Sequence, residues 1–535
     1  MCSTASRQRR FVPSLVIALM LSCHSYASAS ERELDEFVAE EMQRWAIPGL
    51  AVAVVRDGRV VFAKGYGLRQ IGRPEPVDEH TAFGIGSVTK SFTVTAAAML
   101  VDEGKLTWDA PIIDFLPMLH FSDPWLTAHA TVRDLASHRL GIGEPAIYLV
   151  SGGTLERTTR AVRYIRPDVP FRTFLYSNVG YAMLGQTIAE TSGVSWDDFI
   201  ASRIFKPLGM NDSHPSEHSF IDPEWIANCW LCEPPTGAPR GRDALRDRKA
   251  NIASPHGLIA GANPKGAVRT RAAVVPWRSE RSVASTGLIY SSVHDMAQYM
   301  LLHLGRGEFR SQHLLSEAQI KQIHRAHALV LESNAVPGFR AEGYAMGWIV
   351  GTYRGLRASQ HGGGRVGFAS QVWLFPEQKI GVVVLQNLDF REAPHFSPIA
   401  LRFADHYLGL AHEHDKASHE LASKPSVVSA RIGACAESST HSVVQNLERY
   451  AGFYRNDIVG EARVFLEGDD LVLSFDGGAR ADLRPRANGF ILCFRGHEPQ
   501  PTPLTFTFDA AEEPKGFEIG TEPASPLFLR FERVR

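Results

Sequence analysis

The chain has 535 residues, a formal net charge of -2, 44% hydrophobic residues and 21% charged residues. At about 150 residues per domain, this length leaves room for roughly three domains and excludes a small single module. The composition is typical of globular proteins and argues against global disorder. A charge near zero argues against a protein that neutralises nucleic-acid phosphates or an anionic membrane surface, so we expect no nucleic-acid partner.

The N-terminus has the pattern of an export signal. Three arginines within the first ten residues precede the apolar run Phe11 to Leu21, and the small residues Ala27-Ser28-Ala29 follow. This pattern predicts a signal peptide over residues 1–29, cleaved after Ala29, and a periplasmic or secreted mature protein. Cys23 leaves lipoprotein processing open as a less favoured alternative. We expect no transmembrane segment, because no stretch reaches the roughly 20 uncharged apolar residues that a spanning helix needs.

Four cysteines would remain after cleavage: Cys229, Cys232, Cys435 and Cys493. So few cysteines do not make a disulfide scaffold. His214 and His218 could in principle join Cys229 and Cys232 as four zinc ligands. A local disulfide or plain thiols are favoured instead, because an exported Cys-x-x-Cys tends to oxidise and Pro215 would break a helix that aligned the two histidines. We therefore expect no metal.

Helical and extended patterns predict a two-lobed α+β body. Residues 31–45 have apolar residues at helical spacing, and the apolar runs 50–55 and 59–63 flank a tight turn. The runs 371–375 and 380–386 repeat this hairpin pattern, and we expect both hairpins in one antiparallel sheet. Helical stretches between the hairpins cover residues 87–102, 181–191 and 292–304. A helical region is thus expected to be inserted between the first and last strands.

The C-terminal part predicts a second domain. After an amphipathic segment at residues 397–410, residues 411–442 are rich in His, Ser, Lys and Glu and have the composition of a linker. From Tyr450 onward the apolar residues alternate with period two. We therefore expect a body over residues 30–410 and a small all-β, barrel-like domain over residues 443–535.

Ser87 and Lys90 form the first motif with chemical meaning. Residues 86–90 open a helix, and the i, i+3 spacing places the serine hydroxyl and the lysine amine on one face. A serine hydroxyl is a weak nucleophile at neutral pH, and a desolvated lysine amine beside it can remove its proton. Backbone N–H groups at the start of the helix can stabilise the oxyanion that follows attack on a carbonyl. Alone the pattern is weak, because a capping serine followed by a solvated lysine would look the same.

Two further motifs follow in chain order, Tyr176-Ser177-Asn178 and His361-Gly362-Gly363-Gly364. With Ser87 and Lys90 they resemble the serine β-lactamase-like superfamily, which includes class C β-lactamases, penicillin-binding D,D-peptidases, D-aminopeptidases and related esterases. The resemblance covers residues 31 to about 410, and agreement between motifs and patterns strengthens it. It includes the flanking stretches 131–138, 207–210, 285–288, 344–348 and 375–376.

The resemblance implies a β-lactamase/transpeptidase-like fold and a role for each motif residue. Ser87 would be the acylated nucleophile and Lys90 its partner. Tyr176 would exchange protons with the serine and the leaving group, while Asn178 would hold the lysine and the substrate amide. A tyrosinate beside an ammonium is stabilised by opposite charge, so either Tyr176 or Lys90 could serve as the base.

The third motif departs from the common family pattern, because His361-Gly362-Gly363 stands where the family commonly has Lys-Thr-Gly. The oxyanion hole would be the backbone N–H groups of Ser87 and Gly364, with Gly363 beside them. An unperturbed histidine is mostly neutral at pH 7, and glycine has no hydroxyl donor, so a fixed cation for a substrate carboxylate is missing. We therefore do not expect strong β-lactam hydrolysis, and His-x-Gly looks like the D-aminopeptidases, some D,D-peptidases and the esterases.

These observations predict an exported serine hydrolase that forms and then hydrolyses an acyl-enzyme on Ser87, without metal or organic cofactor. A peptidase or amidase on D-amino-acid or peptidoglycan-type peptides is the first choice. An esterase on short acyl esters and a weak β-lactamase are alternatives. A penicillin-binding sensor that is acylated without turnover, or an inactive scaffold, also stays open. The partner would be a small-molecule or peptide substrate, and homo-oligomers are possible.

Two segments outside the motifs bear on substrate access. The strands that begin near Tyr450 resemble the lipocalin-like β domain of many peptidase-type members, which could cover the cleft or serve stability alone. Residues 240–281 contain ten Lys or Arg residues against three acidic residues, a net of +7. This segment could attract anionic substrates, although a solvated variable loop is the favoured interpretation.

Overall fold

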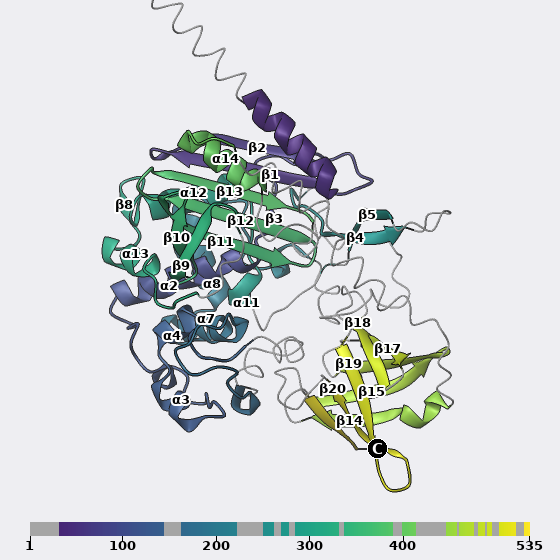
Figure 1. Ribbon diagram of the computed structural model, residues 1–535. Helices are drawn as coiled ribbons and strands as arrows, with labels where there is room; N and C mark the ends of the chain where they lie inside the picture. The colour runs from purple at the N-terminus through teal and green to yellow at the C-terminus, as the bar shows by residue number, and fades with distance from the viewer. Residues whose placement is uncertain are drawn as a thin grey trace, which may run out of the picture.

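A computed structural model gives the fold of the chain (Figure 1). It describes residues 31–143, 162–221, 250–261, 269–275, 277, 284–330, 336–388, 398–412, 446–456, 460–475, 480–486, 489–494, 502–519 and 529–534. The predicted signal peptide, most of the linker and most of the basic segment 240–281 lie outside these residues. Among the described residues, no helix combines the length and the apolar character that crossing a bilayer requires.

The body is built on a seven-stranded antiparallel sheet with the order β2-β1-β13-β12-β11-β10-β9. In this order the strands span Arg59–Gly67, Gly49–Arg56, Ile380–Gln386, Phe368–Phe375, Leu356–Arg365, Ile349–Tyr353 and Phe339–Tyr344. Strand β1 pairs with β13, with Val52 opposite Val384. The two predicted hairpins therefore lie side by side in one sheet, as expected.

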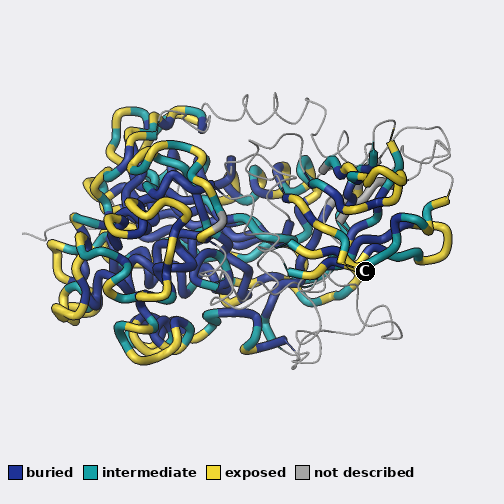
Figure 2. Tube along the Cα trace, turned by 90° about the horizontal axis from the view of Figure 1, so that it is seen from below, coloured by how far each residue is buried: buried dark blue, intermediate teal, exposed yellow. Residues whose placement is uncertain are grey.

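Both faces of the sheet are buried, because side chains alternate between two cores. Along β1, Ala51 and Ala53 belong to the core on one face, whereas Val52 and Val54 belong to the core on the other. Helices α2 (Thr89–Asp102) and α12 (Val293–Leu304) cover the first face together with the helical lobe. The N-terminal helix, residues 31–45, and α14 (Pro398–Leu408) cover the second (Figure 1). Figure 2 shows the buried segments of the chain, in dark blue, gathered in the interior, with exposed segments, in yellow, mainly at the periphery.

The helical lobe lies between the first and last strands in the sequence, as the pattern predicted. Its remaining helices are η2 (Ile112–Asp114), α3 (Pro124–His129), α4 (Val132–Ala136), η3 (Val162–Tyr164), α7 (Asn178–Ser192), α8 (Trp196–Ile200), η4 (Ala201–Phe205), α9 (Lys206–Leu208), η5 (Glu217–Ser219), α11 (Ala284–Gly287) and α13 (Glu317–Ile323). Local chemistry sets the ends of two of them. Thr131 and Asp134 form a capping box at the start of α4, and Gly193 ends α7 with a left-handed backbone.

Three small sheets complete the body. Their strand pairs are β3 (Phe83–Gly84) with β6 (Tyr290–Ser291), β4 (His256–Gly261) with β5 (Arg269–Val274), and β7 (Glu308–Phe309) with β8 (Gln312–His313). The first pair matters most, because β3 leads directly into the segment that contains Ser87. Its antiparallel pairing places Phe83 opposite Ser291 and Gly84 opposite Tyr290.

The C-terminal domain is a closed barrel of eight antiparallel strands, preceded by η9 (Leu447–Tyr450). The strands are β14 (Gly452–Asn456), β15 (Gly460–Glu467), β16 (Asp470–Phe475), β17 (Arg480–Arg486), β18 (Gly489–Phe494), β19 (Thr502–Phe508), β20 (Pro514–Ile519) and β21 (Leu529–Arg533). Pairing of Tyr454 in β14 with Arg533 in β21 closes the barrel. Aromatic side chains, among them Phe506, Phe517 and Phe531, pack in its core. The predicted barrel-like domain is confirmed.

Sequence patterns did not single out β17 and β20. Strand β17 contains three arginines and a proline, and only Ala481 and Leu483 of it are buried. Such a composition masks the period-two signal.

Cys493 in β18 is disulfide-bonded, and every other cysteine of the chain lies outside the described residues.

Candidate active site

Ser87 lies where β3 turns into the long helix α2. It occupies a short 3-10 helix, η1 (Gly86–Val88), and α2 begins only at Thr89. The predicted helix over residues 87–102 therefore begins with a tighter turn. Gly86 has a φ of 51°, a left-handed conformation that glycine adopts without strain. Ser87 is partly exposed, whereas its neighbours Gly86 and Val88 are buried, so the turn presents the hydroxyl to solvent.

Lys90 is fully buried and holds the first and second motifs together. Its Nζ lies 3.1 Å from Ser87 Oγ and donates hydrogen bonds to Asn178 Oδ1 at 2.6 Å and to the Thr286 carbonyl oxygen at 2.9 Å. Thr286 comes from α11, which packs against both α2 and α7. Three segments that are distant in the sequence thus surround one amine.

These contacts bear on the direction of the amine lone pair of Lys90. The Asn178 and Thr286 oxygens can only accept hydrogen bonds, so two of the lysine N–H bonds must point at them. Ser87 Oγ, whose hydroxyl can donate or accept, lies 3.1 Å from the same nitrogen. In its neutral form Lys90 would therefore direct its lone pair at the serine proton, as a general base requires.

The second motif ends at the start of α7. Asn178 is the first residue of this helix, and Tyr176 precedes it by two residues. Lys90 Nζ lies 5.0 Å from the centre of the Tyr176 ring. The structure thus brings Ser87, Lys90, Tyr176 and Asn178 together, as the resemblance implied.

His138 is a site residue that none of the three motifs contains, although it closes the flanking stretch 131–138. Its ring centroid lies 4.2 Å from that of Tyr176, and its Nδ1 accepts the Ser177 backbone N–H at 3.1 Å. Burial, with a smaller contribution from the positive charge of Lys90, holds the pKa of His138 well below its usual value. A neutral imidazole therefore supports the backbone of the second motif.

The third motif lies on β11, directly beside η1. A Cβ atom on Gly363 would overlap the carbonyl oxygen of Ile85, and one on Gly86 would lie 2.5 Å from the Gly364 nitrogen. Glycines at these positions therefore allow two backbones to approach without a side chain between them. Ser370 on β12 supports the same contact by donating to the Ile85 carbonyl at 2.7 Å. Gly364 thus lies next to the backbone that presents Ser87, where an oxyanion hole would be formed.

His361 lies in the site, but other protein groups occupy both of its nitrogens. Its Nδ1 lies 2.6 Å from the Gly362 carbonyl oxygen and its Nε2 lies 3.1 Å from the Tyr344 hydroxyl. The carbonyl can only accept, so the proton is on Nδ1 and Tyr344 donates to Nε2. Burial, together with the Lys90 charge, lowers the pKa of His361 to about 4. The residue is therefore a neutral, buried member of the strand.

Arg365 is the next charged side chain on β11. It forms an ion pair with Glu217 at 3.4 Å, and the Glu217 side chain is fully buried while that of Arg365 is 9% exposed. Its charge is thus compensated within the protein.

Of the residues considered for zinc, His214 contacts Ser219 Oγ through Nδ1 at 3.0 Å, whereas Cys229 and Cys232 lie outside the described residues.

Comparison with known proteins identifies the family of the chain. The Beta-lactamase family model matches residues 34–404. The chain is similar to the unguisins hydrolase ungD' of Aspergillus campestris, with 27% identity over 67% of this chain and 62% of that protein. It thus spans less than two thirds of that relative. It is also similar to penicillin-binding protein 4 of Amycolatopsis lactamdurans, with 27% identity over 64% of this chain and 81% of that protein.

A solved structure shares the fold over nearly the whole chain. The octameric penicillin-binding protein homologue from Pyrococcus abyssi superposes with a TM-score of 0.54 and 23% identity, covering 94% of this chain and 99% of that one. This similarity confirms the predicted β-lactamase/transpeptidase-like fold.

Proposed function

The chain belongs to the Beta-lactamase family, and on this basis we propose that it is a serine hydrolase that acts through an acyl-enzyme on Ser87. One observation carries the assignment. Lys90 is buried with two acceptor-only oxygens and the Ser87 hydroxyl around its amine. A solvated lysine after a capping serine would have no such surroundings.

In the proposed reaction, Lys90 removes the Ser87 proton as Oγ attacks the substrate carbonyl carbon. The developing oxyanion accepts hydrogen bonds from the backbone N–H groups of Ser87 and Gly364. Tyr176, beside Lys90, passes the proton to the leaving group as the scissile bond breaks. Asn178 holds Lys90 and binds the substrate amide. Attack by water on the acyl-enzyme then releases the acid and regenerates Ser87.

For the substrate, we propose amides of D-amino-acid or peptidoglycan-type peptides. The neutral, buried His361 argues against penicillins as preferred substrates, because it supplies no cation for the carboxylate that a penicillin carries. By the same argument, it favours amides whose leaving group has no free carboxylate over peptides that end in one. Arg365 does not supply such a cation either, because its charge is compensated by the ion pair with Glu217. The similarity to a hydrolase named for unguisins also favours hydrolytic turnover.

A second candidate follows from the same neutral third motif. Short acyl esters need neither a cation nor a strong leaving-group acid, so an esterase activity, with weak β-lactamase activity beside it, is the alternative. The similarity to a penicillin-binding protein keeps a third outcome open, in which penicillin acylates Ser87 without turnover.

We further propose that the protein is exported after cleavage near Ala29, because the first 29 residues have the pattern of a signal peptide. The domains would then be a catalytic body over residues 30–410 and a barrel over residues 443–535. Assembly of identical subunits is also proposed, since the Pyrococcus abyssi homologue is octameric.

Intact-mass analysis of the mature protein tests the proposal. The protein would be exposed separately to a fluorophosphonate, a penicillin, a short p-nitrophenyl ester, a D-alanyl peptide and the matching L-alanyl peptide, with Ser87→Ala as control. We expect a stoichiometric adduct on the wild type alone and steady turnover of the D-alanyl peptide. Turnover of the ester alone selects the esterase, and a penicillin burst without turnover selects the sensor. Absence of any adduct would refute the acyl-enzyme on Ser87.

A further inference from the structure

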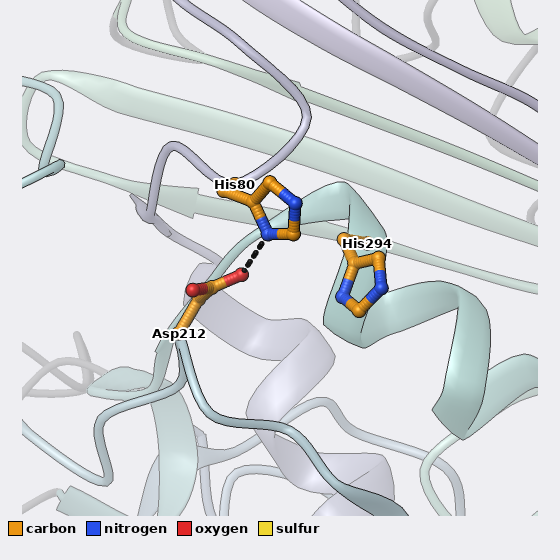
Figure 3. A group of neighbouring side chains, drawn as sticks. All are labelled: His80, Asp212 and His294. Atoms are coloured by element: carbon orange, nitrogen blue, oxygen red, sulfur yellow. Dashed lines mark hydrogen bonds and ion pairs between the residues drawn. The ribbon is translucent and has the colours of Figure 1, made fainter.

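Three side chains from distant segments meet on the surface of the body: His80, Asp212 and His294 (Figure 3). His80 precedes β3, Asp212 follows α9, and His294 is in the first turn of α12. His80 Nδ1 lies 2.8 Å from Asp212 Oδ2, and the two imidazole centroids are 4.6 Å apart. One donor atom from each residue lies within 4.8 Å of the other two. None of these residues belongs to the proposed catalytic motifs.

We propose that His80, Asp212 and His294 form a binding site for a divalent transition-metal ion of the zinc type. Imidazole nitrogens and a carboxylate oxygen are ligands that zinc prefers, and water can complete its coordination. Ligands about 2.1 Å from a shared ion lie roughly 3 to 3.4 Å from each other. The 2.8 Å separation of His80 and Asp212 is close to this spacing. The ion would replace the proton that these two groups now share.

The residues around the cluster orient its donors. Ser292 Oγ donates to Asp212 Oδ2 at 2.9 Å, and the Asp212 backbone N–H donates to Asp295 Oδ2 at 2.8 Å. Asp295 Oδ1 also lies 3.2 Å from His294 Nδ1. A carboxylate that holds a histidine in this way is a frequent neighbour of metal-bound histidines.

The charge around the cluster also favours a cation. Two acidic residues, Asp78 and Glu79, directly precede His80 in the chain, so further carboxylates are close in sequence to the cluster. Among the described residues, neither Asp212 nor Asp295 forms an ion pair with a lysine or arginine. A bound ion would supply the missing positive charge.

An ion from solvent can reach these residues. The His80, Asp212 and His294 side chains are 48%, 26% and 40% exposed. Because they are partly exposed and already adjacent, binding requires only small side-chain rotations and no opening of the core.

The position of the cluster gives the ion a mechanical role. The strands next to His80 and His294 are β3 and β6, which pair with each other. The segment after Asp212 joins them through the His214 N–H, which donates to the Tyr290 carbonyl at 2.8 Å. Ile85, two residues before Ser87, donates to the Ile289 carbonyl at 2.9 Å. An ion at the cluster would therefore tie together the three segments that support the nucleophile turn, at a distance from the reacting atoms.

Zinc binding to the full-length mature protein tests the site. The chelator-treated wild type would be dialysed against Zn²⁺ and compared with the double variant His80→Ala/His294→Ala. A second double variant, His120→Ala/His129→Ala, removes two exposed histidines of the helical lobe and serves as the matched control. Since other histidines and cysteines can bind zinc, the decisive quantity is the difference in bound equivalents.

We expect the wild type and the control to bind one equivalent more than the site variant, and Zn²⁺ to raise their Tm but not that of the site variant. Mg²⁺, which prefers oxygen ligands, should not substitute. Equal zinc content in all three proteins overturns the proposal. If the site variant does not fold, Asp212→Asn, which keeps the side-chain size, decides the question. Zinc affinity at least about tenfold below that of the wild type supports the site, and unchanged affinity refutes it.

Discussion

The imidazole of His138 lies against the ring of Tyr176, with the centroids 4.2 Å apart and the planes 35° apart. The same imidazole accepts the Ser177 N–H and has a backbone φ of 55°. A left-handed residue at this point turns the chain so that its ring faces the second motif. His138 is therefore a positioning residue for Tyr176 and does not itself contact the reacting atoms.

The first prediction concerns this contact. His138→Phe keeps a ring against Tyr176 but leaves the buried Ser177 N–H without its acceptor, which costs about 1 to 3 kcal/mol. We expect kcat to fall about tenfold or more, with a smaller change in KM, because Tyr176 is displaced while the rest of the site persists. Steady-state kinetics on a p-nitrophenyl ester, with circular dichroism to verify folding, measures the split between kcat and KM.

His129→Phe is the matched control for this variant, because His129 is an exposed histidine stacked on Trp125 in the same lobe. It should leave kcat unchanged. A His138→Phe protein with full kcat would show that Tyr176 does not depend on this imidazole.

The second prediction tests how a negative charge at position 178, next to Lys90, affects catalysis when the hydrogen-bond acceptor is kept. Asn178→Asp keeps an acceptor at 2.6 Å but places a carboxylate next to Nζ, which stabilises the ammonium form. A protonated amine cannot remove the Ser87 proton, so kcat/KM at pH 7 should fall by about 100-fold. The loss should shrink as the pH rises, because the amine can then lose its proton.

A pH–rate profile from pH 6 to pH 10 measures this shift. Asn178→Leu, which removes the acceptor without adding charge, should lose activity without the alkaline recovery. Identical profiles for Asn178→Asp and the wild type would argue against Lys90 as the base.

The third prediction compares alanine substitutions at two neighbouring glycines of the third motif, Gly363 and Gly362. Gly363→Ala forces a methyl group into the Ile85 carbonyl, a backbone atom that cannot move aside cheaply. Overpacking of this kind costs about 1 to 3 kcal/mol and should displace the oxyanion-binding strand from Ser87. We expect kcat/KM to fall by about tenfold or more.

Gly362→Ala provides the comparison, since its new methyl group would meet only the Ser370 carbonyl oxygen, at 3.8 Å. This variant should keep most of its activity. Equal losses in both variants would mean that the close approach of β11 to the nucleophile turn is unimportant.

The fourth prediction concerns acid stability. Burial lowers the pKa of His324 to about 3 and those of His256 and His361 to about 4, with the Arg357 charge contributing at His324 and the Lys90 charge at His361. These histidines take up protons in the unfolded chain near pH 6.5 but not in the folded chain until the pH approaches 4. The free energy of unfolding is therefore highest above pH 6.5 and falls as the pH drops towards 4.

Each such histidine contributes a slope of about 1.4 kcal/mol per pH unit within this window. Urea unfolding at several values between pH 4.5 and pH 7.5 measures the total slope. His324→Gln should reduce the total slope by the contribution of one histidine. His129→Gln, at an exposed position, should leave the slope unchanged. A stability that is independent of pH below 6.5 would contradict the burial of these groups.

The sequence was sufficient for features that are local or periodic. The i, i+3 spacing of Ser87 and Lys90 needs one turn of chain, and alternation along residues 50–55 and 380–386 is visible in the residues themselves. The motif order implied the family, and the match over residues 34–404 confirms it. The barrel was predicted from period two, although β17 was missed because its arginines and proline conceal the alternation.

Only the tertiary structure decided which groups surround the Lys90 amine and His361. It also decided which side chains meet in the surface cluster of His80, Asp212 and His294. The Thr286 carbonyl lies 196 positions from Lys90 in the sequence, and a backbone oxygen leaves no signature in residue types. The neutrality of His361 depends on Tyr344 and on burial, both of which arise when β9, β10 and β11 pair. His80, Asp212 and His294 are single residues of common types until the β3 and β6 pairing brings their segments together. The hydrogen bonds and the burial of these side chains arise from contacts between segments that are far apart in the sequence. Residue patterns within one segment do not encode such contacts.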